Sequence, residues 1–130
     1  MTKNLLSEQG LDLALSLLAG QGGLDRPIQH TRIQKSGLAL TGHFHGIVPT
    51  RIQILGQTEQ SFLDSLPSSA RIASMNGFFG LGLSCVVLTG NLGVGSRDIV
   101  AVAERTNTPL FHSTERSSIT ITRLHGLLDE

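Results

Sequence analysis

A short apolar run between two glycines constrains the fold of this chain more than any other feature. Residues 83–88 (Leu-Ser-Cys-Val-Val-Leu) carry no charge and lie between Gly82 and Gly90. Such a run is typical of a strand that is buried on both faces of a sheet. A glycine-rich loop over 90–95 follows, then a helix that Ser96 is expected to cap, then a second short strand over 108–111. Strand, helix and strand in this order predict two strands that pair in parallel.

The first third of the chain has weaker signals. Ser7 is expected to cap a helix, because the apolar residues at 11, 14, 15 and 18 share one helical face. Gly20 is expected to end that helix. Residues 28–33 are expected to be extended, and the glycines between 37 and 46 indicate a structured loop.

The middle and the end of the chain complete the expected architecture. Residues 51–54 alternate between polar and apolar, which predicts a strand with one buried face. Two helices are expected next, over 57–66 and from 67 to about 76. After the second strand of the parallel unit, Ser117 or Ser118 opens a last helix. Together these elements predict an α/β fold in one small domain over residues 1–130, with a parallel or mixed sheet flanked by helices.

Composition excludes several classes of protein. Ten Lys and Arg balance ten Asp and Glu over 130 residues, and the chain has no Trp or Tyr, so no nucleic-acid partner is expected. No apolar stretch approaches the roughly 20 residues of a membrane span, and the start of the chain does not resemble a signal peptide. The single cysteine, Cys85, suits a reducing compartment and reads as a core residue. We therefore expect a cytoplasmic protein without a membrane partner.

The glycine-rich loop is the strongest candidate for a ligand site. Gly90 and Gly95 have the GxxxxG spacing of a phosphate-binding loop, but Ser96 stands where that motif has its lysine. This difference argues against ATP chemistry at the loop. The backbone of Gly90, Gly93, Gly95 and Ser96, together with Arg97, could still hold a phosphate or a carboxylate at the start of the helix. The alternative is a βα turn with Arg97 in water.

A second polar segment follows the second strand. If the two strands pair in parallel, His112, Ser113 and Thr114 lie beside the 90–97 loop, and two neighbouring loops form a better pocket than one. The alternative, which we favour, is ordinary helix capping by Ser117 or Ser118.

Two other pairs of residues are candidates for a functional role. His43 and His45 would share one face of an extended segment, but no third ligand is evident, so no metal site is predicted. Phe78 and Phe79 lie between glycines and suit either a subunit contact or a core pair. The sequence does not choose between these two roles.

Two adjacent motifs resemble one protein family. Residues 37–42 read Gly-Leu-Ala-Leu-Thr-Gly and residues 51–59 read Arg-Ile-Gln-Ile-Leu-Gly-Gln-Thr-Glu, which is similar to the amino-terminal domain of bacterial HPr(Ser) kinase/phosphorylase. Gly-Leu-Asp-Arg-Pro-Ile at 23–28 and Thr-Pro-Leu at 108–110 support the resemblance. Lys35-Ser36 and the 90–95 loop depart from the family's pattern.

The resemblance implies a role for the chain within a larger enzyme. The family phosphorylates and dephosphorylates a serine of the phosphocarrier HPr, controls carbon-source use and is typically a hexamer. Its ATP- or pyrophosphate-dependent chemistry, with magnesium, belongs to a carboxyl-terminal P-loop domain that this chain lacks. Its amino-terminal domain is an α/β sandwich, similar to the uridine-nucleotide-binding domain of muramoyl-peptide ligases.

For this chain, the resemblance implies a non-catalytic assembly or regulatory domain without a cofactor or catalytic residues of its own. Its expected partners are its own catalytic domain, other subunits of a homo-oligomer, and HPr through the full-length enzyme. The alternative is a stand-alone module that binds a phosphorylated metabolite or a nucleotide.

Overall fold

The computed structural model has an α/β architecture and describes residues 15–24, 33–35, 40, 46–93, 95–114 and 119–121. Its five-stranded mixed sheet has the order β1-β5-β4-β3-β2. The strands are β1 (Leu15–Ala19), β2 (Gln34–Lys35), β3 (Ile52–Leu55), β4 (Cys85–Thr89) and β5 (Leu110–Ser113). Strands β2 to β5 run parallel, and β1 pairs antiparallel with β5. The predicted α/β class with a mixed sheet is confirmed.

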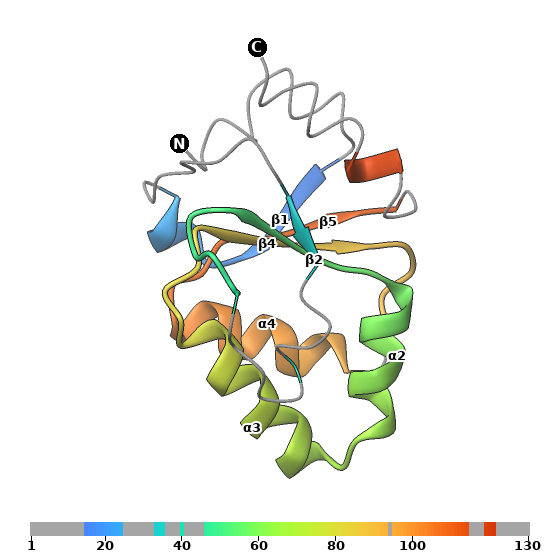
Figure 1. Cartoon of the computed structure of the whole chain (residues 1–130). Helices are drawn as coiled ribbons and strands as arrows, with labels where there is room; N and C mark the ends of the chain where they lie inside the picture. The colour runs from blue at the N-terminus through green and yellow to red at the C-terminus, as the bar shows by residue number, and fades with distance from the viewer. Residues whose placement is uncertain are drawn as a thin grey trace.

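Three helices cover one face of this sheet (Figure 1). They are α2 (Gln57–Ser65), α3 (Ser68–Phe79) and α4 (Ser96–Arg105), and a 3-10 turn, η2, spans Gln21–Gly23. The predicted helices over 57–66 and from 67 are confirmed, and the second extends to Phe79. None of the described helices is long and apolar enough to cross a membrane.

The central strand β4 is buried along its whole length, as its apolar run predicted. Val86 and Leu88 belong to the core between the sheet and the helices, whereas Cys85 and Val87 belong to the core on the opposite face. Phe78 and Phe79 join the helical core and meet edge to face, with ring centroids 5.5 Å apart. Of the two roles left open for this pair, the structure shows the core pair.

Strand β3 corrects the prediction of one buried face. All four of its residues are buried, because β3 lies between two other strands and both faces of the sheet are covered. Gln53 is the polar exception in this strand and has no solvent exposure. Its Nε2 donates to the carbonyl oxygen of Val48 at 3.0 Å and to Oε1 of Gln34 at 3.2 Å, so the buried amide is hydrogen-bonded.

The expected first helix is wrong over residues 15–19, which form β1. Leu15 pairs with Ser113 and Leu17 with Phe111, so the backbone satisfies the open edge of β5. This pairing with a distant strand overrides the local helical spacing. The remainder of that helix, residues 7–14, lies outside the described residues, as do residues 28–32, 41–45 and the capping candidates Ser117 and Ser118.

Two boundaries also shift. Gly95, and not Ser96, is the residue that precedes α4, and no side chain caps the helix from that position. The second strand begins at Leu110 and ends at Ser113, two residues later than predicted. Residues 119–121 are helical, in agreement with the expected last helix.

Gly20 and Gly23 pack closely against the backbone of the segment after α4. Gly20 has a φ of 77°, and a Cβ on it would lie 1.8 Å from the carbonyl oxygen of Thr108. A Cβ on Gly23 would lie 1.9 Å from the carbonyl oxygen of Asn107. The two backbones therefore touch where only glycine leaves room.

Candidate functional site

The two polar loops singled out in the sequence lie side by side at the carboxyl ends of β4 and β5. The backbone N–H of Gly90 donates to the carbonyl oxygen of Ser113 at 2.9 Å. Nε2 of His112 lies 2.7 Å from the carbonyl oxygen of Gly90. Because a carbonyl only accepts, Nε2 carries the proton in this contact. The parallel pairing that was expected to bring the loops together is confirmed.

The described part of the second loop, residues 112–114, contributes little exposed polar surface to this junction. The side chain of Ser113 is buried, and its Oγ accepts from the hydroxyl of Thr120 at 3.5 Å. Thr114 is exposed and His112 is half-buried. Among the residues of this segment that the structure describes, the contact with the first loop consists of backbone groups and the imidazole of His112.

Helix α2 holds the first loop from its other side. Oε1 of Gln57 accepts from the backbone N–H of Asn91 at 2.7 Å, and Nε2 donates to the carbonyl oxygen of the same residue at 3.1 Å. Nε2 of Gln60 donates to the carbonyl oxygen of Thr89 at 2.9 Å. Gly90 has a φ of 81°, and a Cβ on it would lie 2.5 Å from Oε1 of Gln57. Hydrogen bonds from Gln57 and Gln60 therefore hold the segment that follows β4 against α2.

The start of α4 is occupied by a carboxylate of the chain itself. Oδ1 of Asp64, near the end of α2, accepts from the backbone N–H of Gly95 at 2.7 Å. A Cβ on Gly93 would lie 2.1 Å from Oδ2 of Asp64, so the loop backbone is closely fitted to the carboxylate. Negative charge at a helix N-terminus is stabilising, because the free N–H groups and the helix dipole favour it. Asp64 therefore takes the position that the sequence suggested for an external anion.

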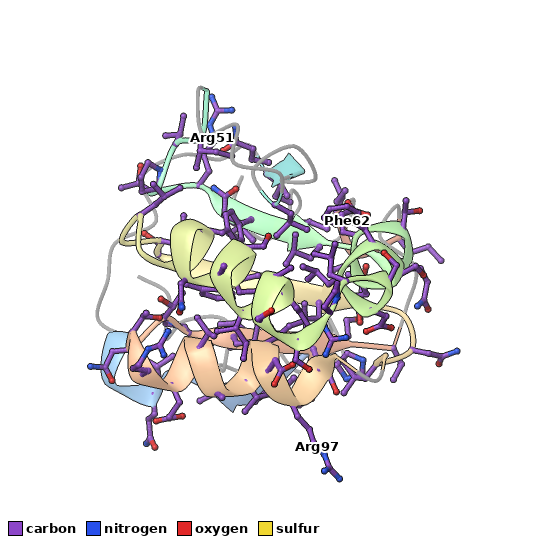
Figure 2. All side chains as sticks on the ribbon, turned by 90° about the horizontal axis from the view of Figure 1, so that it is seen from below. Arg51, Phe62 and Arg97 are labelled. Carbon is purple, nitrogen blue, oxygen red and sulfur yellow. The ribbon has the colours of Figure 1, made fainter. Side chains whose placement is uncertain are left out.

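The arginine beside this loop is not the predicted one. Arg97 is exposed and points away from the molecule (Figure 2). Arg71 of α3 instead approaches the loop, and a Cβ on Gly95 would lie 3.1 Å from its Nε. Nη1 of Arg71 pairs with Oδ2 of Asp98, in the first turn of α4, at 2.8 Å. Arg71 thus links α3 to the start of α4.

The same guanidinium also binds the end of α2. Nε of Arg71 donates to the carbonyl oxygen of Leu63 at 2.9 Å, and Nη2 donates to those of Leu66 at 3.1 Å and Asp64 at 3.3 Å. The last carbonyls of a helix lack partners within the helix, so Arg71 caps α2 from outside.

Sequence reasoning missed the four side chains that organise this site. Gln57, Gln60 and Asp64 are spaced i, i+3 and i+7, which places them on one side of α2. That spacing predicts that the three polar side chains lie on the same side of the helix. It does not indicate which loop they contact. Arg71 has no distinguishing local pattern.

Cys85 is buried in the core. Burial raises the pKa of the Cys85 thiol to about 12, so the thiol stays protonated, and its interpretation as a core residue is confirmed. Among the described residues, no three metal-ligating side chains are grouped together. His43 and His45 lie outside that part of the chain.

The described polar groups around the two loops chiefly bind the chain's own backbone. They fix loop conformation, and Arg97 and Thr114 are the predicted side chains that remain exposed. Binding of a phosphate or carboxylate by the predicted set stays a prediction; that set is Gly90, Gly93, Gly95, Ser96, Arg97, His112, Ser113 and Thr114.

Comparison with known proteins places this architecture in a family. A family model described as the HPr serine kinase N terminus matches residues 2–128. The HPr kinase/phosphorylase of Geobacter sulfurreducens is 34% identical over 128 residues, a match that covers 98% of this chain and 40% of that protein. The chain thus spans about two fifths of the length of this curated relative. Two motifs in the sequence suggested this assignment, and the match extends it over almost every residue: the chain belongs to the family of HPr serine kinase amino-terminal domains.

Proposed function

We propose that this chain is the non-catalytic assembly or regulatory domain of a bifunctional HPr kinase/phosphorylase. The observation that carries the proposal is the extent of the match, which covers nearly the whole chain but only 40% of the Geobacter sulfurreducens enzyme. On this proposal, phosphoryl transfer to and from a serine of HPr, with ATP, pyrophosphate and magnesium, belongs to a separate P-loop domain of the parent enzyme.

The residues of the 90–97 loop support the proposal that phosphoryl transfer belongs to a separate domain. A P-loop needs a lysine that reaches the β and γ phosphates, and Ser96 occupies that position here. The carboxylate of Asp64 also lies at the start of α4, where it would repel a nucleotide phosphate. Both features fit a domain that does not transfer phosphate.

The surface of the helical layer offers residues for contact with the rest of the parent enzyme. Phe62 of α2 is 37% exposed and Ile72 of α3 is 36% exposed. Figure 2 labels Phe62 on α2. Aromatic and aliphatic side chains at the surface suit contacts between domains or subunits. These two residues are our candidates for such a contact.

A phosphoryl-transfer assay tests the catalytic half of the proposal. The purified chain is incubated with HPr, magnesium and either radiolabelled ATP or pyrophosphate, beside the full-length Geobacter sulfurreducens enzyme as a positive control. We expect label on HPr only in the control. Transfer by this chain, free of contaminating kinase, would refute the assignment of catalysis to another domain.

A chimera tests the assembly half. This chain replaces the matching part of the Geobacter sulfurreducens enzyme, and the chimera is compared with an enzyme that lacks the part altogether. We expect the chimera to restore the oligomer size by analytical ultracentrifugation and the response of the kinase to effectors. Phe62→Ser or Ile72→Ser in the chimera should weaken that restoration, whereas the exposed-residue control Ser69→Ala should not. Equal behaviour of truncated and chimeric enzymes would contradict the proposal.

A further inference from the structure

We propose that Arg51 is a docking point for a carboxylate on the rest of the parent enzyme. Arg51 directly precedes β3, so it lies at the amino ends of the parallel strands, whereas the 90–97 loop follows β4 at their carboxyl ends. Figure 2 shows Arg51 and Arg97 at opposite sides of the view. The inference rests on the proposed function, because the carboxylate belongs to a part of that enzyme outside this chain.

The guanidinium of Arg51 lacks the partners that a half-buried cation normally has. Its Nε is buried and has no hydrogen-bond acceptor. Among the described residues, the ion pair is that of Arg71 with Asp98, and no described carboxylate pairs with Arg51. Arg71, by contrast, donates to three carbonyl oxygens in addition to its ion pair. A partly desolvated charge without a counter-charge is unfavourable, and an anion that reaches it offsets that cost.

Hydrogen bonds hold the backbone of Arg51 in place. Its N–H donates to the carbonyl oxygen of Val48 at 3.0 Å, which closes a turn before β3. Nε2 of the buried Gln53 donates to the carbonyl oxygens of Val48 at 3.0 Å and Arg51 at 3.3 Å. Oε1 of Gln34 accepts from the N–H of Val48 at 2.9 Å. The turn that carries Arg51 is therefore ordered before a partner arrives, which lowers the entropy lost on docking.

The surface around Arg51 contains apolar residues and no other charge. Residues 47–51 (Ile-Val-Pro-Thr-Arg) are all half-buried. The N–H of Ser84 donates to the carbonyl oxygen of Pro49 at 2.8 Å, so residues 80–84 lie beside them. Apart from Arg51, neither segment contains a charged residue. An arginine among apolar side chains is typical of a contact between proteins or domains.

A carboxylate on a protein fits this site better than a small anion in solution. Arg51 is the one cation of the two segments, and a single ion pair at a surface is weak in water. A carboxylate of the same enzyme is present at a high effective concentration, so one planar pair of N–H groups is enough to position it. This chain covers 40% of the Geobacter sulfurreducens enzyme, and the remainder of that enzyme is the expected source.

Zero-length cross-linking tests the inference in the chimera described above. Arg51→Lys replaces the guanidinium by an amine, and a water-soluble carbodiimide joins that amine to a carboxylate in direct contact. Mass spectrometry of the digested chimera identifies the joined peptides. We expect a cross-link from position 51 to an Asp or Glu of the Geobacter sulfurreducens part. Arg105→Lys, at an exposed arginine of α4, is the matched control and should give no such product.

Thermal unfolding of the 130-residue chain separates docking from a structural role. Arg51→Met keeps an unbranched apolar side chain and removes an Nε that has no acceptor. Its Tm should therefore lie within about 2 °C of wild type, or above it. Arg71→Met loses an ion pair and three hydrogen bonds, so it should lower Tm by more than about 5 °C.

Two results would overturn the inference. One is that position 51 gives no more cross-linked product than position 105, or is joined only to residues of this chain, in the same copy or in a second one. The other is a loss of more than about 5 °C in the Tm of Arg51→Met, which would show that the arginine stabilises the fold. A chimera that does not assemble contradicts the proposed function, whereas one that assembles without the cross-link contradicts this inference alone.

Discussion

Replacement of Arg71 by methionine should be the most destabilising single change among the exposed or half-buried residues of the helical layer. Its guanidinium makes three hydrogen bonds to carbonyl oxygens at the end of α2 and one ion pair to Asp98. A hydrogen bond to a charged group contributes about 1.5–3 kcal/mol when it is desolvated. Water can reach part of this site, so we expect a total loss of about 2–4 kcal/mol rather than the full sum.

The share of the ion pair in this loss should be small. The side chain of Asp98 is 30% exposed, whereas that of Arg71 is 11% exposed, so solvent screens the carboxylate more than it screens the guanidinium. Surface ion pairs contribute about 0–1 kcal/mol. Asp98→Asn should therefore cost no more than about 1 kcal/mol. Arg71→Lys should fall between the two, because an ammonium keeps the charge but not the planar fork of donors.

Urea unfolding of the two single variants and of the double variant Arg71→Met/Asp98→Asn measures these terms as a cycle. We expect a large effect of Arg71→Met and a coupling energy of about 1 kcal/mol or less. If Asp98→Asn costs as much as Arg71→Met, the ion pair dominates and the capping of α2 by Arg71 is not the main source of stability. If Arg71→Met costs under about 0.5 kcal/mol, neither contact stabilises the fold.

Three other predictions use the same unfolding assay. Gly23→Ala should cost on the order of 2–4 kcal/mol, because the new Cβ would lie 1.9 Å from the carbonyl oxygen of Asn107, whereas Gly46→Ala has open space and should cost about 1 kcal/mol from its positive φ alone. The Cys85 thiol, with its pKa raised by burial from 9.0 to about 12, stays protonated in the folded state when the unfolded state ionises. The contribution of this thiol to the free energy of unfolding should therefore be fully present below pH 9 and fall by about 1.4 kcal/mol per pH unit between pH 9 and 12. Cys85→Ala should abolish this pH dependence. Gln60→Met should stay within about 1 kcal/mol of wild type, because it loses the bond to Thr89 but also removes an Oε1 that is buried without a partner; a loss above about 2 kcal/mol would show that this oxygen is satisfied.

The parallel unit around β4 could be predicted because its signals are local and mutually consistent. The uncharged run at 83–88, the glycines after it and the amphipathic segment from Ser96 each favour one structure. Parallel pairing of β4 and β5 then follows from the handed, short connections of α/β folds. The same reasoning failed at residues 15–19, where helical spacing was real but the open edge of β5, nearly a hundred residues later, decided the structure.

The sequence predicted the loops of the candidate site but not the side chains that pack against them. The sequence indicated the two loops, and parallel pairing placed Gly90 beside His112 and Ser113. It could not indicate that Asp64 and Arg71 fill the space beside the first loop. Their contacts depend on the angle at which α2 and α3 cross the sheet, which follows from side-chain packing and has no periodic signature.

The attachment of β1 has a consequence for the order in which the sheet can assemble. Helical connections join β3, β4 and β5, and the paired residues of these strands lie 24 to 33 positions apart along the chain (Val86 with Leu110, Ile52 with Cys85). Leu15, by contrast, pairs with Ser113, which lies 98 positions later in the chain. Closing so long a loop lowers the conformational entropy of the chain before the new contacts can stabilise it. Contacts between residues this far apart therefore slow folding. We expect β1 to join the sheet last and its amides to exchange with solvent by an opening that leaves the other four strands paired.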